Sequence, residues 1–464
     1  MPLNIDRSPH RRGLIIIIAV YLVANALILA LVNPDVKLTQ AADGGSWQTP
    51  ALALLAHGGF VDLDDPSRPD TYRPPMYPLF QAGVMMVAGV DAIVVAQILL
   101  LLFVGLMFRN FVRDWLPGWE NIGMALLVFN PNVLSKAHFV QSEILFLTFV
   151  TLAFWATAKY VKTGGSWRYA LGAGLGVALA CLTRPTAQFL LFALPVLFPL
   201  LAAVSGRFVA YRIAFLHGAG TFACALIVIA PWVAFVASLG HGVALSDSAG
   251  KYRYVWDQVV MIDAQSKGLS YHETESRLTA PGGAEHDFIA DQGEAWNRMN
   301  VPERNRALIE VGIKKLLSYP LADFAKALYR SQMQFYFAGG AGNWHNLFNI
   351  DAGKVEKAWF SGAQDDGWNL LVRLFSGLSP LGATFSVIAI GFVVVARIVG
   401  VVGLATLAAR GRWDLLMMLC GVIAYFAFVH VFVGNSRYRI AVEPMLMFLM
   451  LSGFDGLRRW TKRS

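Results

Sequence analysis

Residues 14–32 read LIIIIAVYLVANALILALV and contain no charged side chain. This length matches the roughly 20 apolar residues that a helix needs to cross the hydrocarbon core of a membrane. Hydrocarbon offers the backbone no hydrogen-bond partner, so a spanning segment must be a helix or part of a closed barrel. A long unbroken run favours the helix. Because no convincing small-residue cleavage site follows it, we expect an uncleaved first span.

The rest of the chain repeats this pattern. With 56% hydrophobic and 15% charged residues, the 464-residue chain has more apolar surface than a soluble fold needs to bury. The sequence therefore predicts an all-α polytopic membrane protein with about ten transmembrane helices. Arg397 interrupts one run and predicts that its helix ends near that residue. The further runs are 92–112, 120–136, 141–161, 169–183, 186–204, 213–238, 381–408, 413–433 and 438–456.

The short run Met76–Val90 decides the topology, because Pro74, Pro75 and Pro78 break its start. If this run lies at the outer face, many basic residues fall on the cytoplasmic side, as the positive-inside rule requires. If it spans, all of them move outside. We therefore expect a multi-pass protein of the plasma (inner) membrane with both termini in the cytoplasm. The basic residues concerned are Arg109, Arg113, Lys159, Lys162, Arg168, Arg207, Arg212, Arg410, Arg412, Arg458, Arg459, Lys462 and Arg463.

This topology places two polar segments outside, a first loop and a much larger second one. In the larger loop, helical spacing in 302–317 and again after Pro320 predicts amphipathic helices at the membrane surface. We expect one membrane domain over 1–464. It would comprise an N-terminal transmembrane module (1–238) with an outer loop (33–91), a large outer loop (239–380) and C-terminal transmembrane helices (381–464).

Charged residues in the short outer turns form a second pattern. Basic residues at the outer surface oppose the positive-inside trend, which indicates an anionic ligand there. Arginine suits phosphate, because its planar guanidinium donates two aligned hydrogen bonds. Two alternatives stay open: Arg439 and Glu443 can neutralise each other on one helix, and Arg184 before Pro185 can simply end a helix. The set is Lys136, His138, Glu143, Arg184, Arg437, Arg439 and Glu443.

The first outer loop adds a candidate carboxylate. Asp43 stands in AADGGSW, before the flexible pair Gly44 and Gly45, whereas the acidic stretch 62–70 contains prolines and indicates a solvated turn. The histidines lie in separate segments without metal-site spacing. Because the basic residues are scattered and form no single stripe, we exclude nucleic acid as a partner.

The order of these pieces resembles the glycosyltransferase C superfamily, and most closely its branch of protein mannosyltransferases and aminoarabinose transferases. The likeness covers mainly the first 205 residues and the last stretch of the chain, while the large outer loop departs from the family. The matching positions are Asp43, Arg73, Pro74, Pro75, Tyr77, Pro78, Glu143 in QSEILF, Arg184 and Pro185 in LTRPTA, and Arg437, Tyr438 and Arg439.

The resemblance implies an inverting transfer of a hexose or pentose from a polyprenyl-phosphate donor. The acceptor would be an envelope glycolipid, polysaccharide or protein on the periplasmic or extracytoplasmic side, at the surface of the membrane lipid. Asp43 would be the general base, and Glu143 would orient the acceptor or a metal ion. The resemblance leaves open whether a divalent metal is used. Arg73, Arg184, Arg437 and Arg439 would bind the donor phosphate, with Tyr77, Tyr438 and His138 positioning the substrates.

Two other classes of protein compete with this interpretation. A secondary transporter or a lipid-linked-sugar flippase also needs many spans and an anion site, but such proteins usually show internal repeats and polar groups near the midplane. We find no internal repeat, and the candidate residues lie near predicted helix ends. A non-catalytic assembly subunit is the third class, for which the outer carboxylates would be dispensable.

Overall fold

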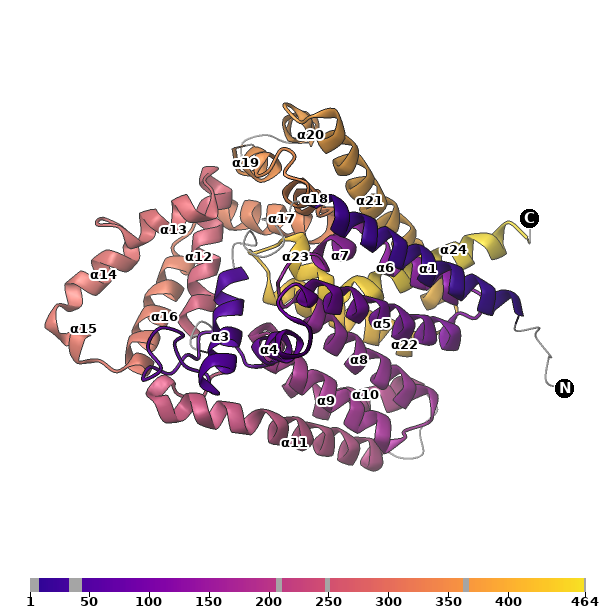
Figure 1. The fold of residues 1–464 in the computed structure, drawn as a ribbon, viewed down its shortest axis with the longest axis horizontal. Coiled ribbons are helices and arrows are strands. Elements are labelled where there is room, and N and C mark those ends of the chain that lie inside the picture. The colour runs from indigo at the N-terminus through magenta and orange to yellow at the C-terminus, as the bar shows by residue number, and fades with distance from the viewer. Residues whose placement is uncertain (1–7, 33–43, 206–210, 247–250, 362–366, 463–464) are drawn as a thin grey trace.

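The computed structural model describes residues 8–32, 44–205, 211–246, 251–361 and 367–462. Within these ranges the regular structure is helical, and the one pairing of extended backbone is an isolated bridge between Val61 and Pro69. Figure 1 shows a bundle of long helices with a group of shorter helices at one end. The predicted class, an all-helical multi-pass membrane protein, is confirmed.

The first half of the chain contains most of the long helices. Two brief segments among them, labelled η, are 3-10 and π-helical. The elements are α1 (Ser8–Leu31), α3 (Gly44–His57), α4 (Met76–Ala88), α5 (Ala92–Trp115), α6 (Glu120–Val128), α7 (Pro131–Lys136), α8 (Glu143–Lys162), α9 (Trp167–Thr183), η1 (Pro185–Ala187), α10 (Leu190–Ser205), α11 (Tyr211–Val236) and η2 (Ala237–His241).

The second half begins with the shorter helices and returns to long ones. Its elements are α12 (Lys251–Lys267), α13 (Tyr271–Thr279), α14 (Ala284–Gln292), α15 (Glu294–Arg298), α16 (Val301–Leu317), α17 (Leu321–Phe337), α18 (Ala341–Leu347), α19 (Lys354–Ser361), α20 (Gly367–Phe375), α21 (Pro380–Ala409), α22 (Trp413–Val429), α23 (Ser436–Arg439), η3 (Ile440–Val442) and α24 (Glu443–Trp460).

Seven helical segments of the described chain are long and apolar enough to cross a membrane, and α4, α9 and α22 are shorter apolar helices. The predicted span at 120–136 is not one helix but two, α6 and α7. Asn130 separates them, because its side chain accepts hydrogen bonds from the backbone of Asn132 and Val133 and so caps a new helix opened by Pro131. The seven long segments are Arg11–Leu31, Ala92–Trp115, Glu143–Lys162, Pro185–Ser205, Tyr211–His241, Pro380–Ala409 and Ser436–Trp460.

The long helices differ in how deeply they are buried. In the segment containing α24, 83% of the apolar window is buried within the protein, and in α8 the share is 72%. The corresponding shares for α1 and for the segment of α11 are only 11% and 22%. Helices that are hydrophobic on all sides and poorly covered by protein are suited to contact lipid. Thus α8 and α24 form the centre of the bundle, while α1 and α11 lie at its periphery.

Arg397 does not end its helix, which corrects the prediction from the sequence. The helix α21 continues through Arg397 to Ala409, and this arginine is buried. Its Nε donates to the backbone carbonyl of Tyr336 at 3.1 Å, and its Nη2 lies 3.5 Å from a carboxylate oxygen of Glu443. A charged residue persists inside a membrane helix when it finds such partners, and no sequence pattern along α21 reveals a partner on α24.

Basic residues gather at one end of the bundle. Lys159 and Lys162 of α8 bind Asp114 at the end of α5, with Lys162 Nζ at 2.7 Å. Nearby helix ends are joined in the same way, since Arg410 and Arg459 both lie about 3 Å from Asp455. In Figure 1, α1 begins and α24 ends on this side, opposite α12 to α16. Many of the basic residues predicted to be cytoplasmic therefore share one end of the molecule.

The shorter helices α12 to α17 have apolar cores of their own. α12 packs against α16 and α17, and Trp256, Val259 and Leu308 belong to one buried cluster. The predicted helix starts are confirmed: α16 begins after a capping box of Asn300 and Glu303, and α17 follows Pro320. A second cluster includes Phe432 from the connection between α22 and α23, which attaches these helices to the membrane bundle.

Candidate active site

A buried carboxylate shared by two arginines lies at the start of α8. Glu143 is the first residue of this helix and is 2% exposed. Its Oε1 accepts a hydrogen bond from Nη1 of Arg184 at 2.9 Å and another from Nε of Arg437. The three residues come from α8, from the end of α9 and from α23. The structure thus brings together three of the residues predicted for the site.

The local sequence explains how Arg184 reaches this position. It precedes Pro185, and steric conflict with a proline ring disfavours the helical conformation of the preceding residue. Arg184 accordingly has an extended backbone, with φ −146° and ψ 126°, and α9 ends at Thr183. Arg184 therefore ends α9, and its side chain also turns to Glu143. Its role in binding phosphate stays a prediction.

The cluster carries more positive than negative charge among the residues that the structure describes. Lys136, at the end of α7, is buried and acts electrostatically on the same carboxylate as the two arginines. Its Nζ donates to Oε1 of Gln141 at 3.0 Å. Three cations beside one carboxylate in a poorly solvated place favour binding of an anion. The other carboxylate oxygen, Oε2 of Glu143, has no hydrogen-bond partner within the described chain, so it can accept a hydrogen bond from a ligand.

Tyr77 and His138 hold the backbone near Glu143 in place. Tyr77 is fully buried and donates to Oε1 of Gln97 at 2.8 Å. The amide nitrogen of Gln97 in turn donates to the carbonyls of Ala137 and Phe139, at 3.2 and 2.7 Å. His138 pairs with Asn25 of α1, Nε2 to Oδ1, at 2.9 Å. These contacts fix the connection between α7 and α8, so the two residues hold the backbone beside Lys136.

Arg73 ties α3 to the segment before α4. Its Nε and Nη2 donate to Oγ of Ser46 at 3.1 and 2.6 Å, and its guanidinium lies 4.5 Å from the ring centre of Trp47. Trp47, Tyr77 and Leu145 form one small buried cluster. Since Leu145 is two residues from Glu143, α3 packs close to the start of α8. Asp43, the residue before α3 in the sequence, lies outside the described residues.

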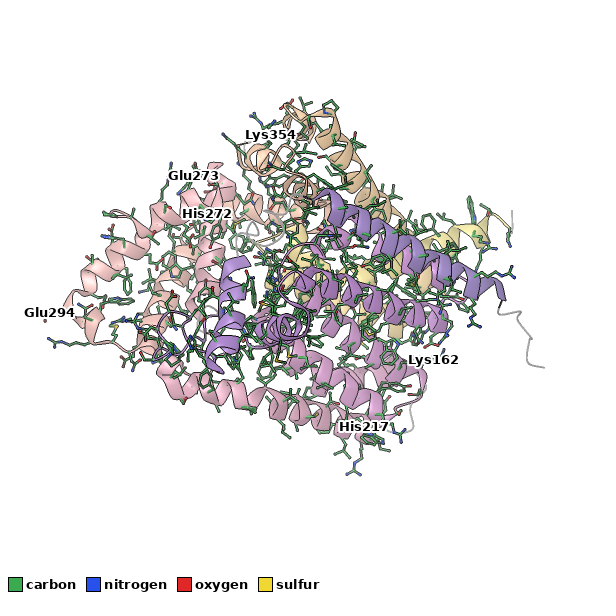
Figure 2. All side chains as sticks on the ribbon, viewed as in Figure 1. Lys162, His217, His272, Glu273, Glu294 and Lys354 are labelled. Atoms are coloured by element: carbon green, nitrogen blue, oxygen red, sulfur yellow. The ribbon has the colours of Figure 1, made fainter. Side chains whose placement is uncertain are left out.

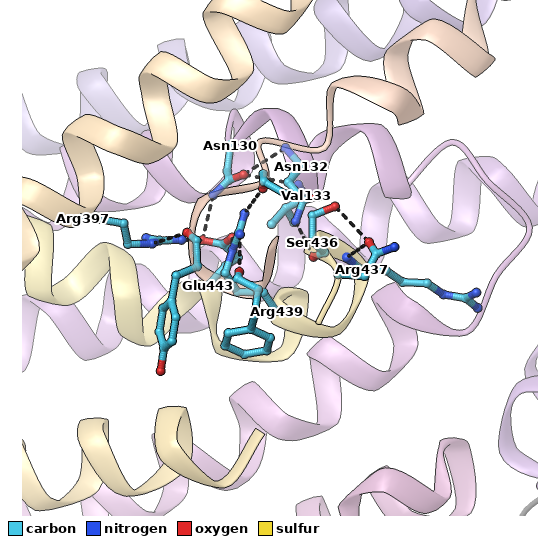
Figure 3. Close-up of polar contacts among 12 residues, drawn as sticks. Asn130, Asn132, Val133, Arg397, Ser436, Arg437, Arg439 and Glu443 are labelled. Carbon is cyan, nitrogen blue, oxygen red and sulfur yellow. Dashed lines mark hydrogen bonds and ion pairs between the residues drawn. The ribbon is translucent and has the colours of Figure 1, made fainter. Parts of the chain in front are cut away.

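A second, separate network surrounds Glu443 (Figure 3). Arg439 is completely buried, and its Nε lies 2.5 Å from Oε1 of Glu443. Its other nitrogens donate to the carbonyls of Phe335 and Ala338, while Asn130 donates to Oε2 of Glu443 at 3.1 Å. Arg439 therefore pairs with Glu443, the alternative that the spacing of the two residues left open. Its role in binding phosphate stays a prediction.

The side chains of Arg437 and Arg439, on either side of Tyr438, thus point to different carboxylates. Figure 3 shows the side chain of Arg437 pointing away from Glu443, while Arg397 reaches toward it. Tyr438, between the two arginines, lies under Arg184, whose guanidinium is 5.9 Å from the tyrosine ring centre. On the same ring stacks His430, with centroids 4.1 Å apart and an interplanar angle of 18°.

Sequence reasoning did not assign three neighbours of this site. All three, His430, Arg397 and Asn130, fall inside apolar runs. A polar residue within a membrane segment is itself a signal of function or of a buried partner. That signal identifies the residues but not their partners, which come from other helices.

The described residues do not form a metal centre. No three His, Cys, Asp or Glu side chains come together in the ranges that the structure covers. Glu143 already shares one oxygen between two guanidinium groups, and positive neighbours oppose a divalent cation, which prefers several oxygen ligands. This set of residues does not fit such an ion, and no chemical step is assigned to one.

Comparison with known proteins supports a single family. No curated protein and no solved structure matches the chain. Residues 72–235 match the model of the dolichyl-phosphate-mannose-protein mannosyltransferase family. This segment contains Arg73, Tyr77, His138, Glu143 and Arg184. The resemblance seen in the sequence is thereby confirmed over residues 72–235, from the segment before α4 to the end of α11, as a likeness to the dolichyl-phosphate-mannose-protein mannosyltransferases.

Proposed function

We propose that this protein is an inverting glycosyltransferase that moves a sugar from a polyprenyl-phosphate donor to an envelope acceptor. The observation that carries the proposal is the Glu143 cluster, in which Arg184 and Arg437 share one carboxylate oxygen beside Lys136. Three cations beside one carboxylate among the described residues, at the end of apolar helices, suit a lipid phosphate. The matched family, whose name includes a dolichyl-phosphate sugar, supports this choice of donor.

The two arginines would hold the donor phosphate and stabilise it as it leaves. Negative charge grows on the leaving phosphate in the transition state, and preorganised donors placed there lower the barrier. Arg184 and Arg437 are held in place by Glu143 before any ligand arrives. They therefore need little reorganisation when the phosphate binds. The prenyl tail would stay among the membrane helices.

The acceptor would be activated by Asp43 and oriented by Glu143. As the acceptor oxygen bonds to the anomeric carbon, its proton passes to the Asp43 carboxylate. The bond from the anomeric carbon to the phosphate oxygen breaks on the opposite face, and the phosphate leaves with the bonding electrons. Oε2 of Glu143, unpaired within the described chain, would accept a hydrogen bond from the acceptor. Inversion follows from this single displacement.

The end of the bundle that holds the cluster would face the periplasm or cell exterior. Asp114 and Asp455 gather basic residues at the other end, where α1 begins and α24 ends. Positive residues favour the cytoplasmic side. This arrangement supports cytoplasmic termini in the plasma (inner) membrane, and it supports an outer-facing site from which the acceptor is reached.

A transfer assay tests the proposal directly. The purified protein in liposomes receives a polyprenyl-phosphoryl sugar labelled in the sugar, together with an envelope lipid and protein fraction as acceptor. We expect label to move to the acceptor, and Glu143→Gln or Arg437→Ala to abolish most of this transfer. Glu294→Gln is the control, because Glu294 is 87% exposed on α15.

The same assay separates the competing functions. A flippase would carry the intact labelled lipid across the bilayer without forming a new glycoside, and an assembly subunit would do neither. Lipid translocation without label transfer, retained in both cluster variants, would refute the glycosyltransferase proposal.

A further inference from the structure

His430 is a buried imidazole beside the Glu143 cluster that the proposed mechanism does not use. It follows the last residue of α22 and is 6% exposed. Its ring stacks on Tyr438, whose other neighbour is the guanidinium of Arg184. Arg184 also acts electrostatically on His430. The imidazole therefore belongs to the surroundings of the arginine that would hold the donor phosphate.

The hydrogen bonds of His430 define its chemical state. Nδ1 lies 2.9 Å from the backbone carbonyl of Phe426. A carbonyl oxygen only accepts, so Nδ1 carries the hydrogen. Burial disfavours the charged ring, and in the neutral ring Nε2 presents a lone pair. Phe426 is one helical turn before His430, so this bond also fixes the ring orientation. His430 is consequently a hydrogen-bond acceptor in a fixed position.

The lone pair of Nε2 is not satisfied by the protein. This atom is buried and has no hydrogen-bond partner among the residues that the structure describes. Buried polar atoms are nearly always paired, and an exception at a binding site indicates a missing water or ligand. Arg184, which acts electrostatically on this ring, directs its hydrogen bonds to Glu143 and Ser142 and not to Nε2. A buried acceptor left unpaired here points to a ligand that donates.

We propose that Nε2 of His430 accepts a hydrogen bond from a hydroxyl group of the sugar carried by the donor lipid. This inference rests on the proposed function. In a sugar phosphate, the ring carbon next to the anomeric carbon carries a hydroxyl close to the phosphate. Arg184, which would hold that phosphate, acts electrostatically on His430, and the hydroxyl would supply the hydrogen-bond donor that Nε2 lacks among the described residues. His430 then distinguishes the sugar-bearing lipid from the bare lipid phosphate.

Binding measurements with two kinds of lipid test this assignment. The full-length protein in nanodiscs is titrated with polyprenyl phosphate and with polyprenyl-phosphoryl mannose, glucose and arabinose. The sugar lipid whose affinity for the protein most exceeds that of polyprenyl phosphate is then titrated against the variants. We expect His430→Phe, which keeps an aromatic ring against Tyr438, to weaken this sugar lipid about tenfold, as loss of one hydrogen bond does. Binding of polyprenyl phosphate should be unchanged.

His430→Gln supplies the matched control. Its amide oxygen can still accept a hydrogen bond, so part of the lost affinity for the sugar lipid should return. Equal weakening of both lipids in His430→Phe would show that the ring only supports Tyr438 and Arg184, and would overturn the proposal. So would unchanged affinity for the sugar lipid, or a defect confined to the KM for the acceptor.

The design also separates this proposal from the proposed function. If no sugar adds affinity to the lipid phosphate in the unmodified protein, the hydroxyl contact does not exist, while binding of polyprenyl phosphate still supports the phosphate site of the proposed function. If the unmodified protein binds none of the lipids, the proposed function fails, and the assignment of His430 fails with it.

Discussion

Arg184 and Arg437 donate to the same carboxylate oxygen of Glu143, although they come from opposite halves of the chain. One anion therefore holds two cations close together, against their mutual repulsion. Breaking a buried ion pair by removing one partner is costly, because the remaining charge stays desolvated. Here two cations share the partner, so among the described residues the cluster keeps a positive charge with Glu143 ionised. Such a positive charge is expected of a site that binds an anion.

Replacing Arg437 should weaken binding of the donor phosphate. Loss of a hydrogen bond from a charged group costs about 1.5–3 kcal/mol, which corresponds to roughly a 10- to 100-fold loss of affinity. We expect this effect for Arg437→Ala and for Arg184→Ala, measured by titration with polyprenyl phosphate. Arg437→Lys should recover only part, since lysine keeps the charge but lacks the planar fork. Arg298→Ala is the control, because Arg298 is 80% exposed on α15. Unchanged affinity in both alanine variants would place the phosphate elsewhere.

Replacing Arg439 should damage stability far more than binding. Arg439 is fully buried and pairs with Glu443 and two backbone carbonyls. Removal of one member of such a pair typically costs about 3–5 kcal/mol. We expect Arg439→Met to lower the thermal unfolding temperature in detergent strongly, while the folded fraction still binds polyprenyl phosphate. Selective loss of that binding at normal stability would instead support direct contact between Arg439 and the phosphate.

Asp43 is the residue on which turnover should depend most. General-base catalysis contributes about 10²–10⁴ in rate, so Asp43→Asn should lower the transfer rate at least a hundredfold. Donor affinity should remain near normal, because the substitution keeps the shape of the side chain. Asp62→Asn is the matched control, since Asp62 is exposed and its carboxylate accepts hydrogen bonds from the amides of Asp64 and Asp65 in its own turn. If the Asp43→Asn variant keeps most of its transfer activity, Asp43 is not the general base.

Surface labelling should reveal the orientation of the bundle. In a background where Cys181, Cys224 and Cys420 are replaced, single cysteines at Asp64 and Glu294 should react with an impermeant thiol reagent in intact cells. A cysteine at Arg168, in the first turn of α9, should react only after the cells are opened. All three positions are exposed, and Figure 2 shows Glu294 and Lys162 at opposite ends of the molecule. Labelling of Arg168→Cys in intact cells would reverse the topology.

Acid should loosen the connection between α18 and α21. Hydrogen bonds from Lys354 and Ser379 lower the pKa of Asp351 to about 2. A carboxylate with a lowered pKa contributes stability above its unfolded value near 3.9, and this contribution is lost as the pH falls through the folded value. Asp351 has a positive φ of 52°, which asparagine tolerates. Protection of the Ser379 amide against hydrogen exchange, taken relative to its intrinsic rate at each pH, should therefore fall between about pH 4 and 2, and Asp351→Asn should remove that change in protection.

The sequence predicts the helical class and the main members of the site for the same physical reason. In a membrane protein, charged residues are expensive within hydrocarbon, so those that remain mark either the ends of spans or a function. Glu143, Arg184 and Arg437 stood out on this ground, and the structure joins them. The starts of α16 and α17 were predicted because proline and capping residues act locally.

What the sequence could not provide is pairing between distant helices. Arg397 looked like a helix end because its partner, Glu443, lies on α24. The sequence also could not show that Arg437 pairs with Glu143 and Arg439 with Glu443. The two arginines are two positions apart on a short helix, and their side chains point in different directions. His430 resembled an ordinary packing residue until the bond to Phe426 fixed its tautomer.

The close crossing of α21 and α24 has a mechanical consequence. A side chain at Gly403 would collide with the carbonyl of Leu449, and one at Gly453 with the carbonyl of Val399. Two helices in such backbone contact cannot slide past each other without separating. The two helices are therefore expected to move as one rigid unit. The ion pair between Arg397 of α21 and Glu443 of α24 holds them together near the site. A motion that lets a lipid enter from the side would therefore involve the peripheral helices, which the rest of the protein covers least. Among the long segments, α1 has the smallest buried share.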